Sequence, residues 1–146
     1  MTWQLKKYNE LTLDELYAIL QARFAVFVIE QQCLYPEIDG KDQAAHHLFK
    51  VQAGKLIAYA RIYQIADKQA ALGRVLITKE YRGKGIAREL LERAIAFVHG
   101  ELQETTIRIQ AQEYLRDFYG SLGFVPVSDV YREDGIPHLD MLFTRP

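Results

Sequence analysis

The sequence predicts one α+β (mixed α/β) domain built on a mixed β-sheet. Apolar residues recur with period two in several short segments, as in strands, and at helical intervals in others. A strand–helix–strand segment surrounds residues 84–99, and such a unit joins parallel strands by a right-handed crossover. The composition, with 49% hydrophobic and 25% charged residues, is that of an ordinary globular domain.

Length, charge and cysteine content exclude several classes of protein. The 146 residues suit a single domain over 1–146, without a linker or an internal repeat. A net charge of −1 argues against nucleic acid as the main partner. No run approaches the roughly 20 apolar residues of a membrane-spanning helix, and from the pattern of the first residues we expect no secretory signal. Because the one cysteine, Cys33, can form neither an internal disulfide nor a multi-cysteine zinc site, we expect a cytoplasmic protein without a metal.

The first third of the chain predicts a strand, a helix and a loop. Residues 2–8 alternate loosely and indicate a strand. Thr12 fits a helix N-cap, with Glu15 at the spacing of a capping box. Residues 30–42 include Pro36, Gly40 and four carboxylates, which indicates a long loop. The helix between Thr12 and this loop is predicted by apolar residues at helical spacing: Leu16, Ile19, Leu20, Phe24 and Phe27.

The remaining elements follow in the order strand, strand, strand, helix, strand, helix, strand, strand. Residues 47–53 and 56–65 flank Gly54 and predict a β-hairpin, and residues 70–78 predict a third strand. Residues 105–111 predict a β-branched strand, and residues 112–122 a helix closed by Gly123. Residues 124–127 and 138–143 complete the strands. The helix over 84–99 is the clearest element, because these residues share one face: Ile86, Leu90, Leu91, Ala94, Ile95 and Val98.

A glycine turn joins the strand at 70–78 to this helix. Gly83 and Gly85 tolerate positive φ angles and let a ligand approach the backbone. The start of a helix offers unpaired N–H groups and partial positive charge, which together attract a phosphate or pyrophosphate. Arg82, Lys84 and Arg88 add positive charge. The same glycines also fit a simple turn and cap, and the turn matches neither a Walker A loop nor a dinucleotide fingerprint.

The turn resembles a family motif. Residues 82–87, Arg-Gly-Lys-Gly-Ile-Ala, resemble the Arg/Gln-x-x-Gly-x-Gly/Ala motif of the GCN5-related N-acetyltransferases (GNAT). Phe118-Tyr119, followed by residues 122–124, Leu-Gly-Phe, resembles the second signature of that family. Residues 27–33, 39–40 and 134–138 resemble its ElaA-type subgroup. The resemblance implies a central, mixed, twisted β-sheet flanked by helices, with a parallel βαβ core that binds acetyl-CoA.

The resemblance also implies which residues hold acetyl-CoA, the acetyl donor. The strand before the turn would pair with pantetheine through Val75, Leu76 and Ile77. Gln112 stands where the family usually has Asn, which puts that contact to pantetheine in doubt. Tyr119 matches the family tyrosine that faces the sulfur. The pyrophosphate would be bound by the turn residues Arg82, Gly83, Lys84, Gly85, Ile86, Ala87 and Arg88.

Direct attack of an amine on the thioester requires an acid and a base. A strand N–H near Leu76 or Ile77 could stabilise the charge on the carbonyl oxygen, and Tyr119 could return a proton to the thiolate. Tyr119 also fits a core position beside Leu115, Phe118 and Leu122. The strand before the turn lacks the Glu that many family members have. Glu30 is therefore the first candidate for the base, ahead of Glu113 and His138.

The expected acceptor site lies between two loops, residues 28–42 and 128–138. Their seven carboxylates would favour a cationic amine, although acidic loops also serve solubility. Glu30, Gln31 and His138 are the candidate acceptor-binding residues. His138 also fits a structural histidine.

The resulting prediction is an N-acetyltransferase that acts on a primary amine of a small molecule or peptide. The alternatives are a catalytically idle acyl-CoA sensor and a phosphate-binding domain unrelated to acetyl-CoA. The expected partner is the amine acceptor, with no nucleic acid and no membrane. A homodimer is left open.

Overall fold

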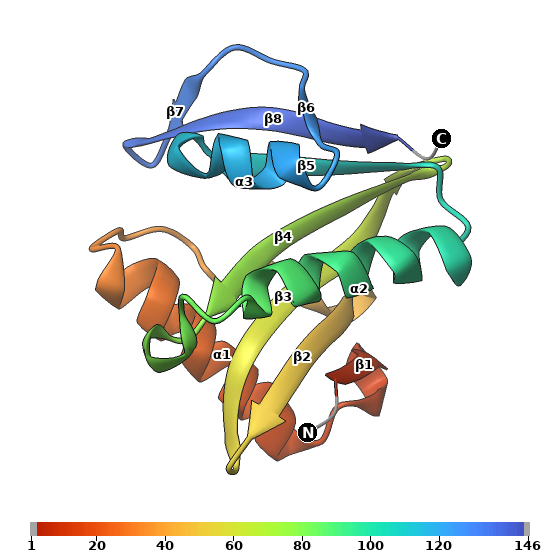
Figure 1. Cartoon of the computed structure of the whole chain (residues 1–146). Helices are drawn as coiled ribbons and strands as arrows, with labels where there is room; N and C mark the ends of the chain where they lie inside the picture. The colour runs from red at the N-terminus through yellow and green to blue at the C-terminus, as the bar shows by residue number, and fades with distance from the viewer. Residues whose placement is uncertain (1–2, 145–146) are drawn as a thin grey trace.

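The computed structural model describes residues 3–144 as an eight-stranded sheet with helices on both faces (Figure 1). The strand order is β1-β2-β3-β4-β5-β8-β6, with β7 paired to β8. The helices are α1 (Leu13–Arg23), α2 (Ile86–Gly100) and α3 (Arg116–Ser121). The strands are β1 (Trp3–Lys7), β2 (His46–Gln52), β3 (Lys55–Ala66), β4 (Gln69–Ile77), β5 (Thr106–Gln112), β6 (Val125–Pro126), β7 (Tyr131–Glu133) and β8 (Ile136–Thr144).

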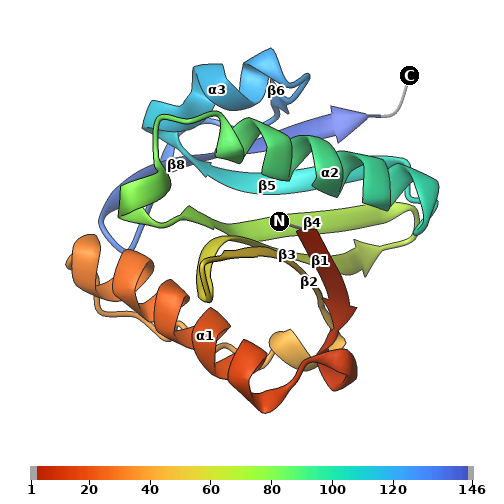
Figure 2. The same cartoon turned by 60° about the horizontal axis from the view of Figure 1, so that its bottom comes forward.

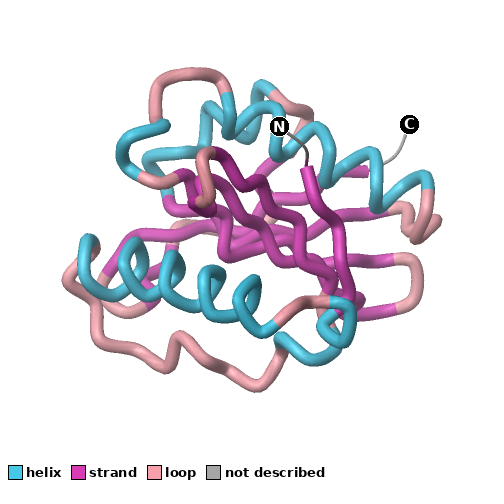
Figure 3. Tube along the Cα trace, turned by 90° about the horizontal axis from the view of Figure 1, so that it is seen from below, coloured by secondary structure: helices cyan, strands magenta, loops and turns pink. Residues whose placement is uncertain are grey.

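The sheet separates α1 from α2 and α3. Figures 2 and 3 show α1 on one face and the other two helices on the opposite face. β4 and β5 run parallel and are joined through α2, whereas the other strand pairs are antiparallel. The predicted mixed fold and its parallel βαβ unit are therefore confirmed.

Two apolar clusters hold these layers together. The larger lies between α2 and the sheet, and Leu90, Leu91, Ala94 and Val98 on the predicted face of α2 are fully buried. The smaller lies under α1 and includes Ile19, Val26, Phe49, Tyr59 and Leu76. Leu76 lies on β4, so this second cluster reaches the strand that leads into the glycine turn.

Local sequence signals set several boundaries correctly. Thr12 caps α1, with the Glu15 amide donating to Thr12 Oγ1 at 3.0 Å and the Thr12 amide donating to Glu15 Oε1 at 2.9 Å. The hairpin of β2 and β3 turns at Ala53 and Gly54, both with positive φ. Within residues 3–144, no helix is long and apolar enough to cross a membrane.

The first helical segment ends at Glu30 as predicted, but its last part, Phe24–Glu30, is wound as a π-helix, with the Gln31 amide donating to the Val26 carbonyl at 3.3 Å. Two other predicted boundaries were wrong. Residues 112–122 are not one helix, because β5 extends to Gln112 and a short 3₁₀ turn precedes α3. The loop over 128–138 contains β7, which pairs with β8 around Asp134 and Gly135. Both turn residues have positive φ, as the Asp-Gly hairpin signal requires. The first predicted strand began at Thr2, which lies outside the described residues.

Candidate functional site

The two parallel strands pair only at their beginnings. Gln69–Ala71 of β4 lies against Thr106–Arg108 of β5, and beyond these residues the two strands separate (Figure 1). Among the residues that the structure describes, β4 from there pairs only with β3, and β5 only with β8. The facing edges therefore present backbone N–H and C=O groups that have no strand partner. An extended ligand can pair with such edges as an added strand does.

The backbone at the start of α2 is rich in unpaired donors. Gly83 and Gly85 have φ angles of 76° and 79°, which favour glycine. The first amide that bonds back within the described turn is that of Glu89, which donates to the Gly85 carbonyl at 3.3 Å. A Cβ added at either glycine would meet no atom within 4 Å. The turn is therefore an open cradle of N–H groups that suits a diphosphate.

The basic side chains around this cradle are engaged with neighbouring elements. Arg88 donates to Ser121 Oγ at 2.6 Å and lies over the Phe118 ring, which places α3 beside the first turn of α2. The Lys84 ammonium lies 5.3 Å from the centre of the Tyr81 ring. Backbone amides are thus the principal free donors of the turn.

Arg82 links the end of β4 to the π-helix. Its Nε donates to the Ile77 carbonyl at 2.9 Å. Its two terminal nitrogens donate to the Glu30 carboxylate at 2.6 and 3.0 Å. These hydrogen bonds from Arg82 lower the pKa of Glu30 despite partial burial. Glu30 is therefore a weaker base than a free carboxylate, and its predicted catalytic role stays a prediction.

Tyr119 lies on α3, in the larger apolar cluster. Its ring is buried and makes edge-on contacts with Phe118 and Phe124. Burial raises the pKa of its hydroxyl well above the ordinary value, so the phenol keeps its proton through the physiological range. Among residues 3–144, no side chain or backbone group forms a hydrogen bond with that hydroxyl. The Tyr119 ring is thus part of the core, while its hydroxyl can donate a hydrogen bond to a ligand.

The far side of the site is formed by the ends of β5 and β8 and by the segment after the π-helix. Gln112 Nε2 donates to Gln31 Oε1 at 3.4 Å, which joins β5 to that segment. His138 lies opposite Gln112 in the register and stacks on Tyr131. His138 Nδ1 lies 2.7 Å from the Ile136 carbonyl oxygen. An N–H at Nδ1 would leave Nε2 as a lone-pair acceptor.

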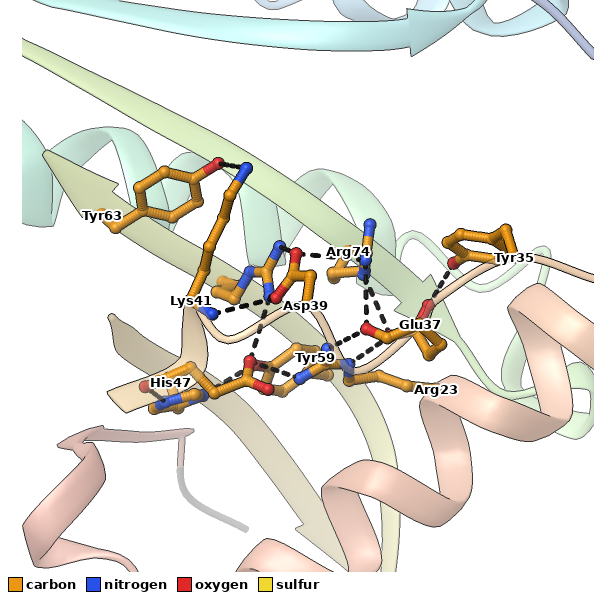
Figure 4. Close-up of polar contacts among 11 residues, drawn as sticks. Arg23, Tyr35, Glu37, Asp39, Lys41, His47, Tyr59, Tyr63 and Arg74 are labelled. Carbon is orange, nitrogen blue, oxygen red and sulfur yellow. Dashed lines mark hydrogen bonds and ion pairs between the residues drawn. The ribbon is translucent and has the colours of Figure 1, made fainter. Parts of the chain in front are cut away.

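The acidic loop after the π-helix is not a free anionic surface. Glu37, Asp39 and Asp42 form ion pairs with Arg23, Arg61 and Arg74. Figure 4 shows Glu37 and Asp39 of this loop with Arg23 and Arg74. Three of the seven expected carboxylates are therefore neutralised inside the protein. The expectation that they attract a cationic acceptor was wrong for these three. The sequence pattern offered no sign of this pairing, because the partners are 14 to 37 residues apart.

A comparison with known families shows to which family the chain belongs. Residues 5–145 match the sequence model of the family described as Acetyltransferase (GNAT) domain. The chain belongs to the GNAT family. It is also 38% identical to protein ElaA of Escherichia coli over 143 residues, which are 95% of this chain and 94% of the relative.

Solved structures agree with this GNAT assignment. A structure described as an acyl-CoA N-acyltransferase from Pseudomonas aeruginosa superposes with a TM-score of 0.93 at 40% identity, covering 99% of this chain and all of the other. Escherichia coli ElaA superposes with a TM-score of 0.93 at 36% identity, covering 98% and 99% of the two chains. This GNAT protein is therefore an acyl-CoA-dependent acyltransferase of ElaA-like sequence.

Proposed function

We propose that this GNAT protein transfers the acetyl group of acetyl-CoA to a primary amine of a small molecule or peptide. The observation that carries the proposal is the opening between β4 and β5, which lies next to the amide cradle of α2. The first feature suits an extended pantetheine arm, and the second suits the diphosphate of coenzyme A. The residues present therefore fit coenzyme A.

The donor would be held mainly by backbone groups. Acetyl-CoA supplies an activated acetyl thioester. The β4 edge over residues 75–77 would pair with pantetheine, and the amides of residues 83–88 would bind the diphosphate. The Thr78 amide donates to the Ile57 carbonyl on β3 at 2.9 Å. Because donors alternate along a strand, the Ile77 amide is directed to the other edge, where it could donate to the thioester carbonyl oxygen.

Tyr119 is the proposed acid. Its hydroxyl keeps its proton because burial raises its pKa, and no described residue competes for that proton. A coenzyme A thiol has a pKa near that of cysteine, about 8.5. Transfer from a phenol of higher pKa is uphill, so Tyr119 would act first as a hydrogen-bond donor to the leaving sulfur.

The acceptor amine would approach between the π-helix and β8. Glu30, Gln31 and His138 are the proposed contacts from the described residues. Glu30 would attract the ammonium form of the acceptor while it stays paired with Arg82. His138, which could leave Nε2 unprotonated, is the second candidate for accepting the amine proton. The four remaining loop carboxylates give a weaker preference for cationic acceptors than the sequence suggests.

One observation supports the alternative of an idle acyl-CoA sensor. The carboxylate first proposed as base is already bound by Arg82. A sensor would bind acyl-CoA but would release no thiol in the presence of any amine.

Thiol release from acetyl-CoA across a panel of primary amines tests the proposal. The panel should include polyamines, aminosugars, aromatic amines and amino-terminal peptides. We expect at least one amine to give thiol release that depends on both enzyme and amine, together with a stoichiometric amount of acetylated product. Tight binding of coenzyme A without turnover on any amine would favour the sensor.

A further inference from the structure

β4 contains a bulge just before the segment that faces the opening. Tyr59 pairs with Leu76 and Arg61 pairs with Gly73, so Ala60 of β3 lies opposite two residues, Arg74 and Val75. Arg74 has a φ angle of 50°, in the left-handed region that disfavours a branched or long side chain. Such an extra residue bends the strand and redirects the groups that follow it.

The side chain of Arg74 is held by the acidic loop. Its Nε donates to Glu37 Oε2 at 2.9 Å, and its Nη2 donates to the Glu37 carbonyl at 3.1 Å. The same nitrogen lies 3.3 Å from Asp39 Oδ2. The guanidinium also lies over the Tyr35 ring, 5.4 Å from its centre. Figure 4 shows Arg74 extending from β4 toward the loop residues that carry these groups.

The loop groups that hold Arg74 are themselves fixed. The Arg23 Nε donates to Glu37 Oε2 at 2.6 Å, and Arg23 is completely buried. Arg61 donates to both Asp39 oxygens at 2.9 and 2.8 Å. The bulge is therefore attached to a set of largely buried ion pairs.

Glycine would adopt this φ angle without strain, yet the chain uses arginine. An arginine in a left-handed conformation persists only where its surroundings hold it. The contacts of Arg74 supply that restraint, and they connect it to the loop that begins at Gln31 on the acceptor side.

We infer that Arg74 is a positioning residue for acyl transfer. Its contacts with Glu37 and Asp39 hold the bulge, and the bulge directs the Ile77 amide toward the position of the thioester carbonyl oxygen. This inference rests on the proposed function for the identity of that oxygen. The claim that Arg74 holds the bulge depends only on the geometry of the chain.

Arg74→Ala removes the contacts and keeps a Cβ at the strained position, whereas Arg74→Gly removes both the contacts and the strain. Arg93→Ala is the matched control, because Arg93 also combines an ion pair, with Glu89, and a ring contact, with Trp3. The readouts are kcat and KM for the best amine, coenzyme A affinity by calorimetry, and amide hydrogen exchange along β3 and β4.

We expect Arg74→Ala to lower kcat by roughly 10–100-fold, the scale set by a displaced oxyanion donor, with coenzyme A affinity changed by less than about threefold. Exchange should accelerate at residues 74–77 but not along β3. Arg74→Gly should lie between wild type and Arg74→Ala, and Arg93→Ala should match wild type.

Two outcomes would overturn the inference. One is a folded Arg74→Ala protein with wild-type kcat and wild-type exchange at residues 74–77. The other is uniform acceleration across β3 and β4 with kcat unchanged, which indicates a purely structural role. If wild type neither binds coenzyme A nor transfers acetyl, the proposed function fails, while local exchange still decides whether Arg74 holds the bulge.

Discussion

The hydroxyl of Tyr119 is the most specific chemical group of the site. It is a proton donor without a partner among the described residues, on a ring that the core already holds in place. The ring explains why the sequence without the family resemblance favours a core position for Tyr119. Only the hydroxyl separates the catalytic role from the structural one.

Tyr119→Phe should therefore keep the fold and the donor affinity but lose turnover. We expect kcat to fall by roughly 10–10³-fold, because acid catalysis contributes about 10²–10⁴ and solvent can partly replace the hydroxyl. The loss should be the same from pH 6 to pH 9, because burial keeps the phenol protonated throughout. Unchanged kcat, with chemistry shown to limit the rate, would assign Tyr119 to packing alone.

Glu30 differs from Tyr119 because its charge is already shared with Arg82. Hydrogen bonds from Arg82 lower its pKa, so Glu30 is ionised throughout the pH range of an assay. Glu30→Gln should raise the acceptor KM by about tenfold or less, since an exposed charge contributes modestly. The pH dependence of kcat/KM should keep its shape, and coenzyme A affinity should not change.

The matched comparison for Glu30 is His138→Asn, measured on the same amine. A fall in kcat in that variant alone, with coenzyme A affinity unchanged, would identify His138 as the base. A fall in kcat in Glu30→Gln that is absent in His138→Asn would return the base to Glu30.

At the scale of elements, the turn before α2 is the proposed binding site for the diphosphate of coenzyme A. Gly85→Val should abolish coenzyme A binding, because the valine side chain would fill the open space over the free amides. Gly54→Val is the control: its φ angle of 74° imposes the same backbone strain in a hairpin remote from the turn. Calorimetry should show binding lost in the first variant and retained in the second. Binding by a folded Gly85→Val protein would place coenzyme A elsewhere.

A substitution in the turn after α3 tests how tightly this turn packs against β8. Gly123 has a φ angle of 105°, and a Cβ there would lie 2.9 Å from the Phe143 ring. Gly123→Ala should lower the free energy of unfolding by roughly 1–3 kcal/mol, from backbone strain and from the clash. Gly120→Ala, in α3 with no atom within 4 Å of its Cβ, should be neutral or stabilising. Equal urea midpoints for the two variants would contradict the packing at Gly123.

The sequence predicts elements better than it predicts contacts between them. The capping box at Thr12 and the apolar face of α2 are local patterns, and both were found where predicted. The π-helix was missed because its winding depends on where Val26 and Val28 are buried, which no local spacing indicates. The acidic loop was misread for a similar reason, since its arginine partners come from α1, β3 and β4.

For the site, short motifs predicted the backbone features but not the side-chain pairings. The two glycines indicated the cradle of α2, and the structure supports it with positive φ angles at both. The contact between Arg82 and Glu30 spans 52 residues and depends on tertiary folding. The bulge at Arg74 could not be predicted from the sequence, because an arginine within a strand does not indicate a left-handed backbone conformation.

At the scale of the whole molecule, the buried ion pairs join α1, the acidic loop and the sheet. Because these ion pairs need ionised carboxylates, we expect the stability of the fold to decrease in acid. Burial raises the pKa of Asp39, but hydrogen bonds from Arg61 and the Lys41 amide, with the charges of Arg61 and Arg74, outweigh it and bring the pKa to about 2. The unfolded value is near 3.9. The ionised carboxylate therefore stabilises the fold above about pH 4, and this stabilisation is lost as the pH falls toward 2.

Urea unfolding from pH 6 to pH 2.5 measures this effect. Asp39 should account for about 1 kcal/mol of the fall in unfolding free energy, a value reduced for its partial exposure. Asp39→Asn should be less stable than wild type at pH 6 and should show a shallower fall. Parallel curves for the two proteins would show that Asp39 does not titrate in this range.

The central claim is that the opening between β4 and β5 serves acetyl transfer to an amine. The most direct test is mass spectrometry of the amine product formed from acetyl-CoA that carries a ¹³C-labelled acetyl group. We predict a labelled, N-acetylated product with wild type and a strongly reduced amount with Tyr119→Phe. It should be absent with Gly85→Val. Labelled acetate without labelled amine on every acceptor tested, or equal product from all three proteins, would contradict the claim.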